Sequence, residues 1–172
     1  LGSVDISSDI FSVGYIVACG RFVELKQFDY LITAFSRTLF ITSDFYLILI
    51  GDGPLLEAAK KLALELGVSS RVIFTGKVNN PIPYFQHAQL GVISSKIEGF
   101  PNVLIEMMGA GIKNILTTPC TEAVKYIPNL TVTENVSLKA LEEGLKNIDI
   151  IGSDFSVNYV DTVKNNYTAE SF

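Results

Sequence analysis

Six short runs of β-favouring residues recur along the chain, and most are apolar at both odd and even positions. A half-exposed strand alternates apolar with polar residues, so these runs predict strands that are covered on both faces. Segments with the spacing of amphipathic helices lie between them. This order predicts an α/β fold, a Rossmann-like, doubly wound parallel sheet flanked by helices. The predicted strands are residues 15–20, 45–51, 71–76, 88–94, 113–118 and 130–133, and the predicted helices are 29–40, 55–66, 101–109, 122–127 and 138–148.

Turn-forming and capping residues mark the ends of several predicted helices. Pro54 is expected at the first position of the second helix, Gly67 just past its end, and Ser137 as the N-cap of the last helix. Two prolines before Tyr84 and Phe85 predict a further short helix packed on the sheet. Ligands of such sheets bind outside the carboxyl ends of the strands, so the residues that follow each strand are searched for a site.

The composition fits one compact domain, because 172 residues with 48% hydrophobic side chains can form a core. A formal charge of −5 argues against nucleic-acid binding through bulk electrostatics, so an anionic ligand needs a local site. No apolar run approaches the roughly 20 residues of a spanning helix, and residues 1–12 lack the pattern of a secretory signal. Cys19 and Cys120 have no CxxC spacing, so neither a disulfide scaffold nor a zinc site is expected. We expect a cytoplasmic protein.

Two cations follow the first predicted strand. Arg21 and Lys26 come directly after Gly20 and precede a predicted helix, so both could reach one phosphate group. The alternative is that Arg21 pairs with Glu24 or Asp29 on the surface while Lys26 is solvated. The residues alone leave both interpretations open.

The turn before the helix that begins near Pro101 is a second candidate for binding an anion. With Pro101 at the first helical position, Phe100 becomes the N-cap, and a phenylalanine side chain cannot accept hydrogen bonds from the first amides. Those amides and the helix dipole favour an anion, and Gly99 allows close approach of the backbone. The turn Gly51-Asp52-Gly53-Pro54 carries its own carboxylate, so it is interpreted as structural.

Glu98 and Glu106 flank this phosphate turn, seven residues separating them. Carboxylates accept hydrogen bonds from hydroxyl groups, so two of them beside a diphosphate suit a ligand with hydroxylated rings at both ends. A nucleotide sugar has that form. The alternative is that Glu98 only adds favourable charge at a helix start and Glu106 is a partly exposed helical residue.

The order of these motifs resembles a known family. The segments are Gly20-Arg21 with Lys26, GDGP at 51–54, RVIFTG at 71–76, NPIPYF at 80–85 and the E-x7-E motif EGFPNVLIE at 98–106. Together they are similar to the C-terminal, donor-binding domain of a GT-B fold, family 4 type, retaining glycosyltransferase. The resemblance extends from about residue 15 to residue 148, and the PNVLIEMM version resembles bacterial enzymes of surface polysaccharide synthesis.

The resemblance implies a role for each site residue. Arg21 and Lys26, beside Gly20, would bind the donor diphosphate, helped by backbone amides of the phosphate turn, and Glu106 would hold the ribose. Glu98 would contact the transferred sugar, and the base would lie near Lys77 and Val78. Arg21, Lys26 and Glu98 are the implied catalytic residues, and the turn contributes Gly99, Phe100, Asn102 and Val103. Such enzymes need no metal and no cofactor besides the nucleotide-sugar donor.

This chain departs from the family pattern in one loop, and the resemblance also implies how the whole protein is organised. Where the family commonly has a glycine pair before a glutamate, this chain has residues 117–123, TTPCTEA, so no binding role is assigned to them. Residues 1–172 are expected to form one nucleotide-sugar-binding domain, a fragment with loosely ordered or truncated ends at about 1–12 and 153–172. Its implied partners are a missing N-terminal acceptor domain and a membrane-associated, lipid-linked acceptor, but no nucleic acid. The whole protein would be cytoplasmic or peripheral to the inner membrane.

Two other classes of protein compete with a glycosyltransferase. One is a nucleotide-binding or regulatory module without catalysis, which has no use for paired carboxylates around a phosphate turn. The other is a nucleotide-sugar epimerase of similar architecture, which needs further acid and base groups. A dehydrogenase is disfavoured because GxGxxG is absent after the first predicted strand. The sole histidine, His87, is expected at a loop or helix end, without a catalytic role.

Overall fold

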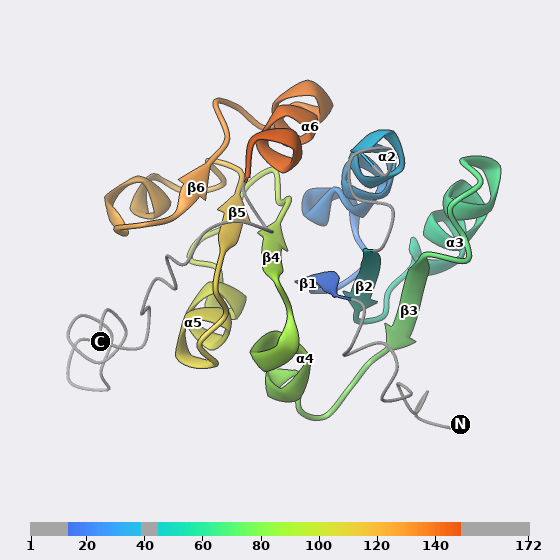
Figure 1. Ribbon diagram of the computed structural model, residues 1–172, viewed down its shortest axis with the longest axis horizontal. Coiled ribbons are helices and arrows are strands. Elements are labelled where there is room, and N and C mark those ends of the chain that lie inside the picture. Colours follow the sequence, from blue (N-terminus) through green and yellow to red (C-terminus); the bar gives the residue numbers. More distant parts are fainter. Residues whose placement is uncertain (1–13, 39–44, 149–172) are drawn as a thin grey trace.

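The computed structural model describes residues 14–38 and 45–148, which form a three-layer α/β domain (Figure 1). A six-stranded sheet has the order β3-β2-β1-β4-β5-β6, and every neighbouring pair is parallel. The predicted doubly wound fold is therefore confirmed. The expected loose ends, 1–12 and 153–172, lie outside the described residues. No helix within the described part of the chain is long and apolar enough to span a membrane.

All six predicted strands are present, each shorter than its apolar run. Their bounds are β1 Tyr15–Cys19, β2 Tyr46–Ile50, β3 Val72–Gly76, β4 Leu90–Ile93, β5 Ile115–Thr117 and β6 Thr131–Val132. The central strands are almost entirely buried, as strands covered on both faces must be. The first strand, β1, lies in the middle of the sheet, β2 and β3 follow toward one edge, and β4 then lies on the other side of β1. The direction of strand addition thus reverses between β1 and β4.

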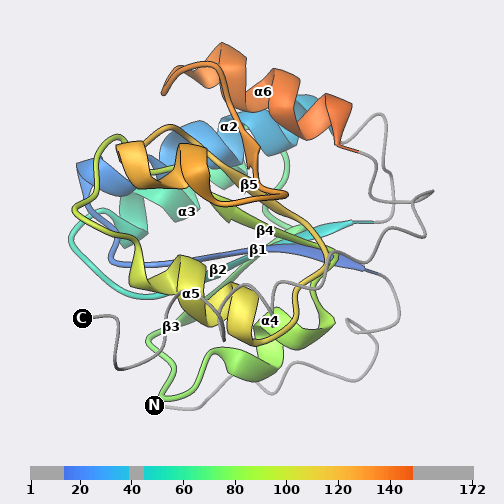
Figure 2. The same cartoon turned by 90° about the vertical axis from the view of Figure 1, so that its left-hand side faces the viewer.

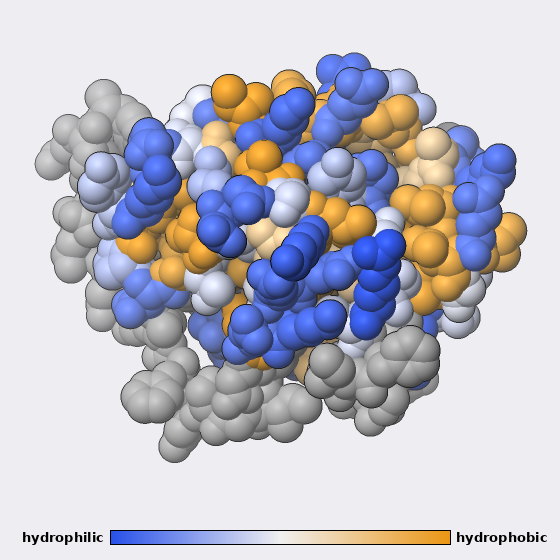
Figure 3. Space-filling model, turned by 90° about the horizontal axis from the view of Figure 1, so that it is seen from above, coloured by the Kyte–Doolittle hydropathy of each residue, from blue (hydrophilic) through white to orange (hydrophobic). Residues whose placement is uncertain are grey.

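Helices cover both faces of the sheet. Their bounds are η1 Glu24–Lys26, α2 Phe28–Thr38, α3 Leu56–Glu65, α4 Ile82–His87, α5 Asn102–Gly109, η2 Glu122–Tyr126 and α6 Leu138–Asn147, where η marks a 3-10 helix. Helices α2, α3 and α6 lie on one face and α4 and α5 on the other (Figure 2). Figure 3 shows the molecule from the side of α2, α3 and α6, where hydrophilic side chains cover much of the outer surface. The short helix expected around Tyr84 and Phe85 is α4, and the Phe85 side chain of this helix is fully buried.

Two buried clusters hold the layers together. Leu31 and Phe35 of α2 pack with Leu141 of α6 against alternate residues of the strands, such as Leu47. On the opposite face Met107 and Met108 of α5 pack with Phe85 of α4 and with Val17. Burying each such side chain contributes roughly 1.5–3 kcal/mol, so both layers are firmly attached to the sheet. The loops at the ends of the strands therefore extend from a rigid base.

The boundaries of α3 and α6 confirm two capping predictions and correct one. The Ser137 hydroxyl accepts a hydrogen bond from the Ala140 amide at 3.2 Å, as an N-cap does. Gly67 follows α3 with a φ of 71°, the left-handed conformation expected past a helix end. The expectation that Pro54 opens this helix is wrong, because α3 begins at Leu56. Pro54 instead belongs to the turn that leads into the helix.

Candidate functional site

The loops that follow β1 and β4 meet at the point where the sheet order reverses. The Lys96 amide donates a hydrogen bond to the Leu25 carbonyl at 2.7 Å, and the Ser94 hydroxyl donates to the Lys26 carbonyl at 2.7 Å. Ligands of doubly wound sheets bind at such a switch point, beyond the carboxyl ends of the strands. The structure therefore brings both candidate anion-binding segments to the expected location.

Lys26 and Glu98 form an ion pair across this junction. The Lys26 ammonium lies 2.5 Å from Oε1 of Glu98, and the Ser95 hydroxyl donates to the same oxygen at 2.6 Å. The Lys26 and Glu98 side chains are 21% and 18% exposed, so the pair is largely screened from water. The alternative of a solvated Lys26 is wrong. Nor does Arg21, which is exposed, form an ion pair with any other residue of the described segments.

Because Gly20 has no side chain, the Lys26 side chain has room to pass over it and reach Glu98. The aliphatic part of its side chain runs over Gly20, where an added β carbon would lie 3.1 Å from Lys26 Cε. Gly51 and Gly53, in the loop after β2, approach the same segment from the other side. A β carbon at Gly51 would lie 1.9 Å from the Gly20 carbonyl oxygen, and one at Gly53 would lie 2.6 Å from the Phe22 oxygen. The GDGP loop is therefore a structural support for the loop after β1, as the sequence predicts.

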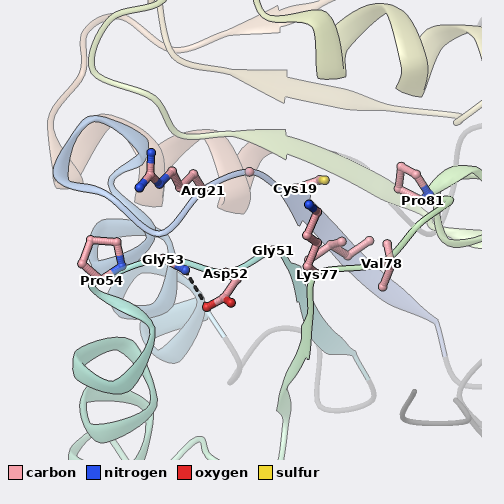
Figure 4. Close-up of a pocket in the computed structure, with 11 residues that line it drawn as sticks. Cys19, Arg21, Gly51, Asp52, Gly53, Pro54, Lys77, Val78 and Pro81 are labelled. Carbon is pink, nitrogen blue, oxygen red and sulfur yellow. Dashed lines mark hydrogen bonds between the residues drawn. The ribbon is translucent and has the colours of Figure 1, made fainter. Parts of the chain in front are cut away.

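A pocket of about 640 Å³ opens beside this junction, over the carboxyl ends of β1, β2 and β3. Figure 4 shows Arg21 and Pro54 on one side of it, Val78 and Pro81 on the other, and Lys77 between them. Its lining comprises Cys19, Gly20, Arg21, Ile50, Gly51, Asp52, Gly53, Pro54, Lys77, Val78 and Pro81. Of the predicted site residues, the pocket thus unites Gly20, Arg21 and Val78.

The Asp52 carboxylate is partly engaged within its own turn. Its Oδ1 accepts a hydrogen bond from the Gly53 amide at 2.7 Å (Figure 4). Its carbonyl accepts from the Phe22 amide at 2.9 Å and so helps to hold the first loop. Arg21 and Lys77 supply two positive charges to the pocket against the one negative charge of Asp52. A local excess of positive charge in an acidic chain suits an anionic ligand.

The phosphate turn has a helix start one residue later than predicted. Helix α5 begins at Asn102, so Pro101, not Phe100, is the N-cap residue. The reason is that Pro101 has an extended ψ of 94° and does not enter the helix. The prediction of an uncapped helix start is confirmed, because no side chain accepts a hydrogen bond from the first turn. The amides of Asn102 and Val103 face no capping oxygen there.

The other residues of the turn differ in accessibility. Gly99 is exposed, and a β carbon added to it would meet nothing within 4 Å. Phe100 and Val103 are partly buried against the cluster beneath α5, whereas Asn102 is exposed. None of them lines the 640 Å³ pocket, nor do Lys26, Glu98 and Glu106. Lys26 connects them to the pocket, because its side chain runs over Gly20, which lines the pocket.

Cys19 shows that Glu106 and Lys26 share this neighbourhood. Burial and, second to it, the Glu106 carboxylate raise the pKa of the Cys19 thiol to about 11, while the Lys26 ammonium opposes the shift. Cys19 also lines the pocket, so the charges of Glu106 and Lys26 act on one of its lining residues. Glu106 itself is exposed on α5. At neutral pH the thiol therefore stays protonated, and a protonated thiol is a poor nucleophile.

Residues 117–123, to which no role is assigned from the sequence, hold the phosphate turn in place. The Glu98 amide donates to the Cys120 carbonyl at 2.8 Å, and the Thr121 hydroxyl donates to the Gly99 carbonyl at 3.2 Å. The Thr118 hydroxyl donates to the Ser95 carbonyl at 2.5 Å. The hydroxyl side chains at the end of the predicted strand 113–118 and just after it are the available signal. No group of three metal-ligating side chains occurs among the residues that the structure describes.

A parallel sheet with uncapped amides and cations at its switch point defines an α/β domain with a candidate site for an anion. Residues 14–151 match the family model described as glycosyl transferases group 1, and the chain belongs to this family. A curated relative, the lipopolysaccharide core biosynthesis glycosyltransferase LpsE of Rhizobium meliloti, is 38% identical over 96 residues, which are 56% of this chain and 27% of LpsE.

Solved structures share the fold. TarM of S. aureus, determined as a mutant in complex with Fondaparinux, alpha-GlcNAc-glycerol and UDP, has a TM-score of 0.81 at 18% identity. The match covers 93% of this chain and 34% of that one. The C-terminal domain of LpcC, a group 1 glycosyl transferase of Francisella tularensis, has a TM-score of 0.76 at 23% identity, covering 91% of this chain and 87% of that one. The predicted resemblance to GT-B glycosyltransferases of bacterial surface polysaccharides is confirmed.

Proposed function

We propose that this chain is the donor-binding half of a retaining, metal-independent glycosyltransferase. The whole protein would transfer a hexose-type sugar from a nucleotide sugar to a glycan or lipid-linked acceptor. The observation that carries the proposal is the Lys26–Glu98 pair at the switch point, 2.5 Å apart, next to a pocket that contains Arg21. A ligand that carries both phosphate and hydroxyl groups needs a cation for the phosphate and a carboxylate for the hydroxyl groups, close to each other.

The parts of the donor are assigned to the parts of the site. The diphosphate lies between Arg21, Lys26 and the α5 amides, and the base lies in the pocket near Val78. Glu106 accepts hydrogen bonds from the ribose hydroxyls, and Glu98 accepts them from the transferred sugar. A crystal structure of TarM, which shares this fold, contains UDP, and this supports a nucleoside diphosphate as the ligand class. The charge of the pocket supports the same class.

The mechanism follows from where charge develops. When the anomeric bond breaks, negative charge grows on the leaving diphosphate while the sugar gains oxocarbenium character. Preset cations and amides stabilise that diphosphate more in the transition state than in the ground state. Each charge-assisted hydrogen bond contributes about 1.5–3 kcal/mol. Glu98, close to the sugar, favours the positive charge that develops there.

The remainder of the protein is also part of the proposal. An N-terminal domain would bring the acceptor to the switch-point edge of the sheet, which agrees with this chain spanning 27% of LpsE. The role of LpsE in lipopolysaccharide core synthesis supports a glycan or lipid-linked acceptor. We place the enzyme in the cytoplasm, peripheral to the inner membrane, where nucleotide sugars meet lipid-linked acceptors.

A thermal-shift panel tests the proposal. UDP, GDP, ADP and their glucose or mannose conjugates are added to the chain, and one nucleoside series is expected to raise the melting temperature selectively. Arg21→Ala is expected to weaken that ligand by about tenfold or more in calorimetry. The matched control is Arg37→Ala, which removes a cation of α2 that pairs with Glu142. Unchanged binding by folded Arg21→Ala would refute the diphosphate assignment.

A non-catalytic nucleotide module makes a different prediction in the same panel. Such a module would bind nucleoside diphosphates and their sugar conjugates equally well, because it has no use for Glu98. Tighter binding of the conjugate, lost in Glu98→Gln, would favour the transferase. An epimerase would convert the bound nucleotide sugar without an acceptor, which chromatography of the recovered ligand detects.

A further inference from the structure

The two oxygens of the Glu98 carboxylate differ in the hydrogen bonds that they accept. Oε1 accepts from the Lys26 ammonium at 2.5 Å and from the Ser95 hydroxyl at 2.6 Å. Within residues 14–38 and 45–148, no donor reaches Oε2. A carboxylate can accept about four hydrogen bonds. One oxygen is thus held by the protein, and the other keeps its full capacity for a ligand.

Ser95 is itself held in place. Its side chain is buried, with 2% exposure, and its carbonyl accepts from the Thr118 hydroxyl at 2.5 Å. Thr118 is equally buried, and its amide donates to the Ile93 carbonyl at 2.9 Å. The Ser95 hydroxyl therefore extends from a backbone that the segment after β5 anchors to β4. A donor fixed in this way can hold the rotamer of the acceptor it contacts.

The neighbouring residue, Ser94, uses a different kind of acceptor for its hydroxyl group. A buried hydroxyl needs a hydrogen-bond partner, and a backbone carbonyl is the usual one. Ser94 follows that pattern by donating to the Lys26 carbonyl at 2.7 Å. Ser95 instead donates to a side chain that already has a cationic partner. The two serines thus hold the main chain of Lys26 and the side chain of Glu98, the two members of the ion pair.

We infer that Ser95 is a positioning residue for recognition of the transferred sugar. It fixes Oε1 of Glu98, so that Oε2 is presented to a ring hydroxyl in a single orientation. This inference rests on the proposed function, in which Glu98 contacts the sugar. Ordering the Glu98 side chain before the donor arrives removes that entropy cost from binding. Ser95 therefore affects the sugar part of the donor and not its diphosphate.

Two ligands that differ only by the sugar separate these effects. The pair is UDP with UDP-glucose, GDP with GDP-mannose or ADP with ADP-glucose, whichever pair the chain binds. Ser95→Ala is expected to change nucleoside diphosphate affinity by less than about threefold, while the extra affinity due to the sugar falls about tenfold. Ser95→Thr keeps the hydroxyl and is expected to retain the sugar contribution. Calorimetry gives both dissociation constants for each variant.

Controls distinguish positioning from a general loss of structure. Ser36→Ala removes a hydroxyl that donates to the Thr33 carbonyl within α2, and it is expected to leave both affinities unchanged. If Ser95→Ala does not fold, Thr118→Val carries the same test, because it releases the Ser95 carbonyl. Its expected result is also a reduced sugar contribution at retained nucleotide affinity.

The outcomes separate the inference from the proposed function. If Glu98→Gln loses the sugar contribution and Ser95→Ala keeps it, the role of Ser95 is overturned and the proposed function stands. If Ser95→Ala weakens both ligands equally, the residue is merely structural and the inference is overturned. If the unmodified chain binds no nucleotide of any series, the proposed function and the inference both fall.

Discussion

The ammonium of Lys26 contacts Oε1 of Glu98 although the two residues are 72 positions apart in the chain. The contact joins the loop after β1 to the loop after β4, which are neighbours only because the sheet order places those strands side by side. It also sets a carboxylate next to the proposed position of a diphosphate. The lysine offsets the repulsion that an unpaired carboxylate would exert on that anion.

Replacing Lys26 by Met tests this arrangement. The variant keeps the aliphatic stem that runs over Gly20 but loses the charge. Affinity for the nucleoside diphosphate is expected to fall about tenfold or more, because a cationic partner is lost and Glu98 is left without its counter-charge. Isothermal titration calorimetry measures the change.

Lys60→Met is the matched control for this experiment. Lys60 lies on α3, where it pairs with Glu57 at 2.7 Å on an exposed surface. Loss of an exposed pair costs only tenths of a kcal/mol, and nucleotide affinity is expected to stay the same. Equal weakening by both lysine variants would show that overall charge, and not the junction of the two loops, governs binding.

Gly51→Ala tests the support that the GDGP loop gives to the site. Gly51 has a φ of 138°, and its β carbon would lie 1.9 Å from the Gly20 carbonyl oxygen. Strained backbone and a clash with main-chain atoms are expected to cost about 3 kcal/mol or more in the free energy of unfolding. Urea denaturation followed by circular dichroism measures this loss.

Gly67→Ala separates strain from collision. Gly67 also has a positive φ, of 71°, but a β carbon added there would meet nothing within 4 Å. Only the conformational cost applies at this position, about 1–2 kcal/mol. A Gly51→Ala variant no less stable than Gly67→Ala would contradict the close approach of the two loops.

The fold could be predicted because its signals are local. Runs apolar on both faces and helical spacing are both read within a few residues, and all six predicted strands occur in the structure. The first residues of two helices were predicted wrongly, for a physical reason. Pro54 and Pro101 fit the first position of a helix, but each lies in the turn before its helix, where a fixed φ is equally suitable.

The site could be predicted only in part. Residues after strands were expected at one edge, and Arg21, Lys26 and Glu98 are there. Their pairing depends on which strands are neighbours, and periodicity carries no information on strand order. The hydrogen bond from Thr118 to Ser95 forms because β4 lies beside β5, so no local sequence motif indicates it.

Cys19 provides a test of the pocket by chemical labelling. Its pKa is raised from 9.0 to about 11, so the reactive thiolate at pH 7.5 is about a hundredfold scarcer than for an unperturbed thiol. Alkylation by iodoacetamide is expected to be slow at pH 7.5 and to accelerate as the pH rises toward the pKa. Mass spectrometry follows the modification, and a Cys19→Ser variant separates it from labelling of Cys120.

A bound nucleotide is expected to slow this labelling further, because Cys19 lines the pocket. The comparison is made at a single pH, so that the fraction of thiolate stays the same. Labelling of Cys19 that proceeds equally fast with saturating nucleotide would place the ligand elsewhere.

Glu106→Ala tests recognition of the ribose. The carboxylate is exposed on α5, and its charge acts on Cys19, which lines the pocket. If it accepts hydrogen bonds from ribose hydroxyls, the unmodified chain binds UDP, or the matching nucleotide, more tightly than the 2′-deoxy form by about tenfold. Glu106→Ala is expected to bind both forms alike, at the weaker affinity. Glu57→Ala, which removes an exposed carboxylate from α3, is expected to retain the preference. A preference for ribose that survives in Glu106→Ala would assign the hydroxyls to another residue and would leave Glu106 as a solvent-exposed residue of α5.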